Sequence, residues 1–173
     1  MISGIGIDIL SLPRFTQFVR RRGAGKVARR ILTSGEMERF VKIQSSSSPS
    51  LGSSLGFLEK GKDAGKEEKE GDEDLIQKQV KFLSSRWCIK EAAYKSLTPL
   101  LPRPPSWKSF HLAHSPSGQP SLDIVQLPGP GLPGLGGGGG GGGGERWRLM
   151  ATLSHDAGVV VGVVVALDKQ FGI

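Results

Sequence analysis

The sequence predicts an α+β fold, in which a mainly antiparallel sheet is packed with helices. A strictly alternating segment typical of a strand lies near the N-terminus, further strand segments occupy the C-terminal part of the chain, and helical periodicity occupies the region between them. Strands and helices are therefore segregated along the chain rather than regularly alternated, which favours α+β over a parallel α/β sheet.

Two tracts of biased composition are expected to stand outside the core. Residues 45–78 join a serine-rich run to a Lys/Glu/Asp-rich run, with too few apolar side chains to offset the entropy lost on ordering. Residues 128–144 form a Pro/Gly run that ends in nine consecutive glycines, as in a flexible linker. We expect a single domain over residues 1–173, with low-complexity inserts at these two places.

The first elements are a strand and a basic helical region. Residues 3–10 alternate, so that three isoleucines share one face while two glycines and Asp8 share the other, where the missing bulk leaves room for something to approach the backbone. Residues 14–32 predict a helix or a pair broken at glycines. Residues 33–43 predict a further helix, with Thr33 or Ser34 as its cap.

A helix over residues 80–97 and two hairpins complete the expected elements. Ser84 or Ser85 can cap this helix. Residues 106–127 predict one hairpin, and 147–154 pair with 159–167 across a four-residue turn. The last strand is apolar on both faces, so we expect it to be central.

Charge is unevenly distributed and predicts an anionic partner. The net charge is +7, and nine Lys or Arg residues lie between positions 14 and 42 against two Glu. Such a surface attracts nucleic acid, anionic lipid or an acidic protein. The single cysteine excludes an intrachain disulfide, and the longest apolar run is about half the length of a membrane-spanning helix.

Asp8 on the strand and Glu91 on the helix are the candidate metal ligands. Mg²⁺ prefers hard oxygen ligands and often takes one or two carboxylates together with water and substrate phosphates. Lys95 follows Glu91 by one helical turn and would direct a cation at the same phosphate. Spacing alone leaves the alternative of a solvated Glu–Lys pair without metal.

These residues belong to a longer pattern. The motifs GIGIDI, RWCIKEAAYKSL, GQP and LSHDAG occur in the order of the holo-acyl-carrier-protein synthase family of 4′-phosphopantetheinyl transferases, which the sequence resembles. The resemblance implies the fold of that family. It also implies Mg²⁺-dependent transfer of the phosphopantetheine arm of coenzyme A to a serine of an acidic apo acyl carrier protein, with release of adenosine 3′,5′-bisphosphate.

The resemblance also suggests roles for residues. It implies that Asp8 and Glu91 hold the metal, and that Lys95 either stabilises developing charge or assists deprotonation of the serine. The candidate contacts to coenzyme A are Arg86, Lys90, Ser154 and His155. The candidate contacts to the carrier are Arg14, Arg20 and Arg21.

The family's usual glycine-rich loop after this helix is replaced here by TPLLPRPPSW, so contacts to coenzyme A are expected to differ there. Family members form homotrimers, so a homotrimer is expected. No cleavable targeting segment is visible, which leaves a mitochondrial and a cytoplasmic location both open. The inserts suggest a eukaryotic, fungal-type lineage.

Two other functions fit parts of the sequence. An inactive relative would bind the carrier without metal, and a basic module would bind nucleic acid phosphates. The second is disfavoured because aromatic residues make up 6% of the chain and no recognition motif accompanies the arginines. The sequence therefore favours the enzyme, with neither a membrane nor a nucleic acid as partner.

Overall fold

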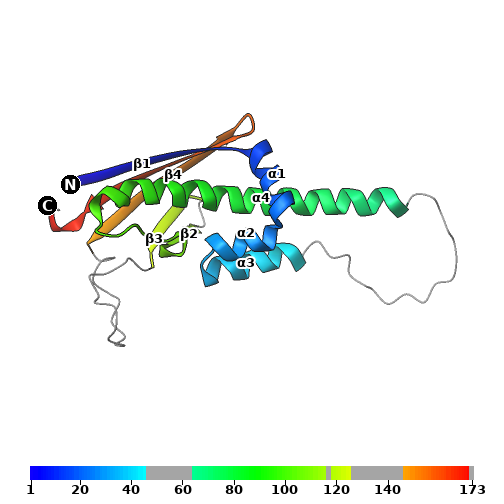
Figure 1. Ribbon diagram of the computed structural model, residues 1–173, viewed down its shortest axis with the longest axis horizontal. Coiled ribbons are helices and arrows are strands. Elements are labelled where there is room, and N and C mark those ends of the chain that lie inside the picture. The colour runs from blue at the N-terminus through cyan, green and yellow to red at the C-terminus, as the bar shows by residue number, and fades with distance from the viewer. Residues whose placement is uncertain (46–63, 116–117, 126–145, 172–173) are drawn as a thin grey trace.

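A computed structural model describes residues 1–45, 64–115, 118–125 and 146–171, and confirms the predicted α+β class (Figure 1). The helices are α1 (Leu12–Arg22), α2 (Ala24–Ile31), α3 (Ser34–Ser45) and α4 (Ala64–Leu97). The strands are β1 (Ile2–Ser11), β2 (Phe110–His114), β3 (Pro120–Ile124), β4 (Trp147–Asp156) and β5 (Val159–Asp168). Short 3₁₀ turns cover Thr98–Leu100, Trp107–Ser109 and Lys169–Phe171.

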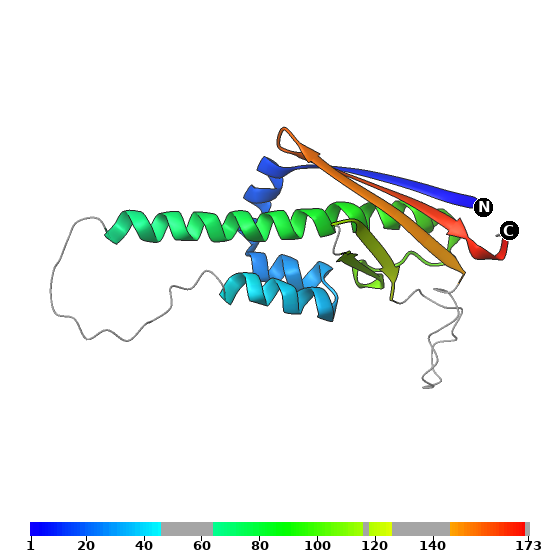
Figure 2. The ribbon, with the colours of Figure 1, turned by 180° about the vertical axis from the view of Figure 1, so that it is seen from behind.

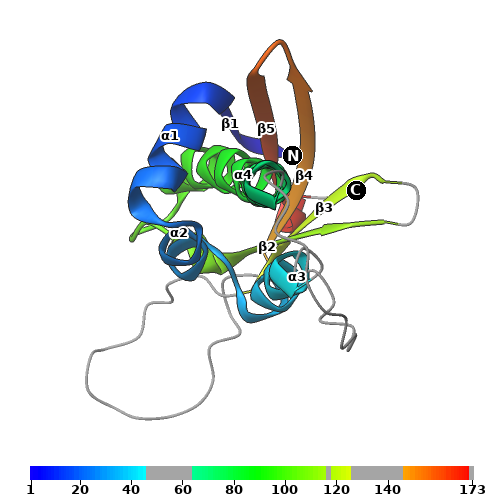
Figure 3. The same cartoon turned by 90° about the vertical axis from the view of Figure 1, so that its right-hand side faces the viewer.

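The strands form two antiparallel sheets. One has the order β1-β5-β4, and the other is the β2-β3 hairpin. The apolar strand β5 is central, as its sequence predicts. The C-terminal part of helix α4 runs along one face of the larger sheet, and α1, α2 and α3 gather beside the middle of α4, as Figures 2 and 3 show from two further directions.

The β4-β5 hairpin turns more tightly than its sequence predicts. Strand β4 continues to Asp156, so only Ala157 and Gly158 form the turn. Both have positive φ angles, of 47° and 76°, as in the two-residue turns that match strand twist. The Asp156 carboxylate accepts a hydrogen bond from the Ala157 amide at 2.8 Å, which supports the unusual φ of Ala157.

Helix α4 begins much earlier than predicted. It starts at Ala64, within the tract 45–78 that was expected to be an insert, and Ser84 and Ser85 lie inside it rather than capping it. Their hydroxyls donate to the carbonyl of Lys81 at 3.2 and 2.9 Å, so they are satisfied within the helix. Glu and Lys are good helix formers, and a helix propagates readily from a packed segment. The expectation for 128–144 lies outside the described residues.

The interior contains two apolar clusters, which follow one another along α4. One joins the C-terminal half of α4 to the strands and includes Ile89, Phe110 and Val164. The other joins α1, α2 and α3 to the middle of α4 and includes Val19 and Phe40. Within the described ranges, no helix combines the length and apolar character needed to cross a membrane.

Helix α4 lies directly against the glycine face of β1. A Cβ on Gly4 would collide with the carbonyl oxygen of Ser96, and one on Gly6 with that of Ala92. The two glycines therefore allow strand and helix backbones to touch, and the room that they leave on this face is filled by α4. The opposite face of β1 is open, with Ile7 53% exposed.

Replacing Gly6 with alanine should destabilise the fold. The new methyl group would meet the backbone of α4, which cannot rotate aside, so we expect a loss of about 1–3 kcal/mol in the free energy of unfolding, measured in urea. Gly71→Ala is the matched control. Gly71 lies in an exposed part of α4 with free space around a Cβ, so alanine should stabilise there by up to about 1 kcal/mol. Equal effects of the two substitutions would contradict this packing.

Candidate active site

Asp8 and Glu91 lie at the same cavity, as the sequence predicts. The cavity has a volume of about 740 Å³ and lies between β1, α1 and α4. Asp8 enters it from the glycine face of β1, and Glu91 enters it from α4, one turn after Trp87. The close packing at Gly6 thus brings a strand carboxylate and a helix carboxylate into one space.

The charged groups at this cavity affect one another's pKa values. The Lys95 ammonium donates to Asp8 Oδ1 at 2.9 Å and to the carbonyl of Ile7 at 3.0 Å. This hydrogen bond to Asp8 raises the pKa of Lys95. Partial burial and then the negative charge of Asp8 raise the pKa of Glu91, and Lys95 opposes that shift. Two carboxylates therefore lie close to one lysine, and because Arg14 and Arg21 also line the cavity, its charge is mixed rather than net negative.

Cys88 packs against the backbone of β1 at Asp8 and has a structural role. Its single thiol hydrogen has two acceptors in reach, the carbonyl oxygen of Asp8 at 3.3 Å from Sγ and that of Val160 at 3.6 Å. Burial, followed by the charge of Asp8, raises the pKa of Cys88 to about 12, so the thiol stays protonated. Gly162 provides the space, because a Cβ there would lie 3.2 Å from the Cys88 sulfur. A neutral buried thiol is not a nucleophile, and Cys88 therefore supports the strand that carries Asp8.

Aromatic side chains form the apolar wall of the cavity. Phe15, Phe18 and Trp87 line it, and their rings are in mutual contact with centroid separations of 5.6 to 5.9 Å. Trp107 also packs against Trp87, with their ring centroids 4.6 Å apart. This wall limits water around the carboxylates on one side, which strengthens electrostatic interactions there.

The donor set at this cavity fits Mg²⁺. Two carboxylates are the usual protein contribution to a magnesium site whose remaining ligands are water and substrate phosphates. Over the described parts of the chain, no group of three or more His, Cys, Asp or Glu side chains is arranged as a metal site of protein ligands alone. Asp8 and Glu91 therefore suit a hard cation shared with a phosphorylated substrate better than a structural zinc.

The three predicted arginines of α1 divide into two groups. Arg14 and Arg21 line the Asp8–Glu91 cavity, and both are exposed. Arg20 points elsewhere and pairs with Glu73 of α4, with Nη2 to carboxylate distances of 2.6 and 2.5 Å. The structure thus brings Arg14 and Arg21 to the candidate site, while Arg20 is held by the chain's own acidic helix.

Ser154 and His155 lie away from that cavity within one chain. Both are exposed at the end of β4, and His155 lines a separate cavity of about 390 Å³. Lys78 and Lys81 of α4 line the same cavity, although the sequence analysis assigned them no role. The two cavities share no lining residue, so His155 does not meet Asp8 in a single chain.

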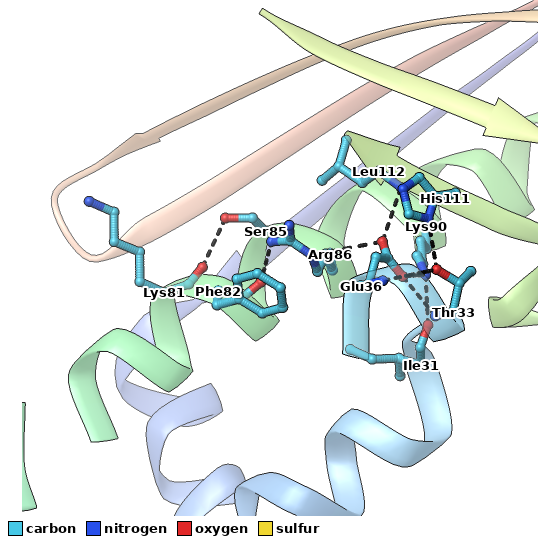
Figure 4. Close-up of polar contacts among 10 residues, drawn as sticks. All are labelled: Ile31, Thr33, Glu36, Lys81, Phe82, Ser85, Arg86, Lys90, His111 and Leu112. Carbon is cyan, nitrogen blue, oxygen red and sulfur yellow. Dashed lines mark hydrogen bonds and ion pairs between the residues drawn. The ribbon is translucent and has the colours of Figure 1, made fainter. Parts of the chain in front are cut away.

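Arg86 and Lys90 occupy places that the sequence analysis did not foresee. They were expected to flank the Glu91 face, but they are 4% and 1% exposed and turn into the protein. Lys90 Nζ donates to Glu36 Oε2 at 2.5 Å and to the carbonyl of Ile31 at 2.7 Å (Figure 4). Arg86 Nε lies 3.8 Å from Glu36 Oε1. Neither cation is therefore presented to a ligand in this structure, and the assignment of both to coenzyme A is not supported by their placement.

Glu36 is the centre of this buried network. Besides the two cations, its carboxylate accepts from the amide of Thr33 at 2.9 Å and from the amide of Leu112 at 3.0 Å. The Thr33 hydroxyl also contacts His111 Nδ1 at 2.7 Å. Figure 4 shows cations from α4, the amide of Leu112 from β2 and Thr33 from the link between α2 and α3 around the carboxylate of Glu36. The spacing of Thr33 and Glu36 predicts a helix start, but nothing in it indicates a partner 54 residues away.

Burial dominates the electrostatics of the two cations. It lowers the pKa of Lys90, against the attraction of Glu36, and it lowers the pKa of Arg86 to about 10. Arg86 also donates to the carbonyl of Phe82 at 3.0 Å, and its guanidinium lies 3.3 Å from the centre of the Phe82 ring. The charge of Glu36 is thus what makes two buried cations tolerable.

Comparison with known proteins identifies the family of this chain and agrees with the fold. Residues 4–132 match the model of the 4′-phosphopantetheinyl transferase superfamily. A holo-[acyl-carrier-protein] synthase of Shewanella sp. (strain MR-7) is 30% identical over 125 residues, which covers 72% of this chain and 72% of that protein.

Solved structures share the fold at lower identity. The holo-ACP-synthase of Plasmodium yoelii has a TM-score of 0.59 and 14% identity, covering 98% of this chain and 97% of that one. A holo-(acyl-carrier-protein) synthase of Bacillus anthracis in complex with CoA (3′,5′-ADP) has a TM-score of 0.57 and 19% identity, covering 98% and 99%.

The buried network predicts that the charge of Glu36 is needed for stability. Glu36→Gln removes the charge that two buried cations share, so we expect about 3–5 kcal/mol less free energy of unfolding in urea. Glu38→Gln is the control, because Glu38 lies on the exposed side of the same helix and should change stability by no more than about 0.5 kcal/mol. If Glu36→Gln and Glu38→Gln lower the free energy of unfolding by the same small amount, Glu36 does not stabilise the buried cations.

Proposed function

As the chain belongs to the 4′-phosphopantetheinyl transferase superfamily, we propose that it transfers the phosphopantetheine arm of coenzyme A to a serine of an apo acyl carrier protein. It is an enzyme of the holo-[acyl-carrier-protein] synthase type. The observation that supports the proposal most is the meeting of Asp8 and Glu91 at one cavity beside Lys95. The products would be holo carrier protein and adenosine 3′,5′-bisphosphate.

The reaction is a phosphoryl transfer, which depends on positioning and charge neutralisation rather than on a covalent intermediate. Asp8 and Glu91 would hold Mg²⁺, which, when bound, offsets charge on the diphosphate of coenzyme A and polarises the reacting phosphorus. Lys95 donates to two oxygens beside this position and supplies a further positive charge. The wall of Phe15 and Trp87 limits water near the reacting groups.

Arg14 and Arg21 would receive the carrier. Both are exposed and lie at the edge of the cavity that contains the two carboxylates. Acyl carrier proteins are acidic, so these cations would steer the carrier toward the cavity and orient its serine there. Screening by salt should weaken this association.

We further propose that the active assembly is a homotrimer, with sites completed between chains. The isoleucines of β1 form an exposed apolar strip with their neighbours on β5, where Ile7 lies opposite Val163. Ile5 and Ile9 are 60% and 68% exposed, and a strip of this kind typically marks an interface. A neighbouring copy could then bring its His155 cavity, with Lys78 and Lys81, to the phosphates of coenzyme A.

Transfer should be visible as the added mass of phosphopantetheine on an apo carrier incubated with coenzyme A, Mg²⁺ and this chain. Asp8→Asn and Glu91→Gln should each slow transfer at least about 100-fold, because each removes a charged ligand from the site. Chelation with EDTA should stop the reaction, and added Mg²⁺ should restore it.

Glu38→Gln serves as the control and should retain the full rate, since Glu38 is exposed on α3 and lines none of the cavities described. Carrier binding without any mass gain, over a panel of apo carriers, would instead identify an inactive carrier-binding relative.

The mass of the assembly can be measured by light scattering, and three times the 18.4 kDa chain mass is expected. Ile7→Glu should yield single chains, because the charge would be buried in the proposed interface. Val41→Glu is the control, since Val41 is 52% exposed on α3, away from the strip, and should leave the mass unchanged. A single-chain mass for the unaltered protein would refute the trimer.

A further inference from the structure

Three consecutive acids of α4, at positions 72–74, lie near the basic helix α1, and Glu73 among them binds Arg20. Arg20 Nη2 lies 2.6 Å from Glu73 Oε1 and 2.5 Å from Oε2, so one guanidinium nitrogen binds both carboxylate oxygens. Gln77, one turn further along α4, donates to Glu73 Oε1 at 3.3 Å and helps to orient the carboxylate. Both charged side chains are about half exposed, so the pair lies at the surface and is open to a competing ligand.

Glu73 differs from the two acids beside it. Asp74 pairs with Lys78 of its own helix at 2.6 Å, and among the described residues no ion pair involves Asp72. Only Glu73 of the three bridges to α1. Arg21, the residue after Arg20, lines the Asp8–Glu91 cavity and belongs to the surface proposed to receive the carrier.

From this arrangement we infer that Glu73 is a specificity-determining residue, which occupies Arg20 in place of a carboxylate of the acidic carrier. The inference rests on the proposed function, because it requires a carrier that binds α1. The carrier and α4 offer Arg20 the same chemical group, and a guanidinium bound to one carboxylate has fewer donors left for another.

Replacing the carboxylate of Glu73 at Arg20 by a carboxylate of the carrier changes the free energy little. An exposed ion pair contributes little net free energy, so the carrier can displace Glu73 from Arg20. The free energy of carrier binding is then reduced by the free energy of the Arg20–Glu73 pair that is lost. A partner with a single suitable acid therefore gains almost nothing at Arg20. A carrier whose acids reach Arg14 and Arg21 as well gains enough to displace it, so the contact discriminates against weakly acidic partners.

The test measures binding of a fluorescently labelled bacterial apo acyl carrier protein, by anisotropy, in the absence of coenzyme A. Glu73→Gln should lower the dissociation constant about threefold at low ionic strength, because Arg20 is released. The gain should disappear at about 1 M salt, where charges a few ångströms apart are screened. Asp72→Asn is the matched control, since it removes the same charge one residue away and should change the dissociation constant much less.

Two further variants show whether the effect passes through Arg20. In an Arg20→Gln background, Glu73→Gln should do no more than Asp72→Asn does. Circular dichroism should show unchanged helix content in each variant. Equal effects of Glu73→Gln and Asp72→Asn, weaker binding by Glu73→Gln, or no measurable binding of the carrier would each overturn the inference. Loss of the proposed function is read separately, as the absence of mass transfer by the unaltered chain.

Discussion

The contact between β1 and α4 is the constraint on which the site depends. Side chains normally keep a strand and a helix apart, but Gly4 and Gly6 let the backbone of β1 touch that of α4. Asp8, two residues after Gly6 on the same face, is thereby brought to the cavity that Glu91 enters from the helix. A bulkier residue at either glycine would separate the carboxylates, and the proposed metal site would lose one of its two protein ligands.

A second constraint fixes the rotation of α4. Lys90 and Glu91 are adjacent in sequence and therefore point in different directions from the helix axis. Because the Lys90 ammonium is held inside the protein by Glu36, the carboxylate of Glu91 must face the cavity. Glu36 also binds the amide of Leu112 on β2, so the same carboxylate connects helix and hairpin. The buried ion pair thus acts on the site by orienting the helix that carries it.

Much of this organisation follows from local sequence, and the remainder depends on contacts between distant segments. Alternation of side chains predicts the strand at Asp8, and Gly23, with φ of 81°, ends the first helix. The apolar character of β5 on both faces accounts for its central place in the sheet. The burial of Lys90 was not predictable, because an isolated helix pattern does not show that an acid from α3 will neutralise it. The early start of α4 was missed because composition suggested disorder, whereas Ile76 packs against the second core.

Crystals soaked in Mn²⁺, which can replace Mg²⁺ at oxygen ligands, would test the central claim most directly by anomalous scattering. The account predicts a peak bonded to the carboxylates of both Asp8 and Glu91, within one chain, at distances typical of metal–oxygen bonds. A peak bonded to other residues, or carboxylates that point away from each other with no peak between them, would contradict it.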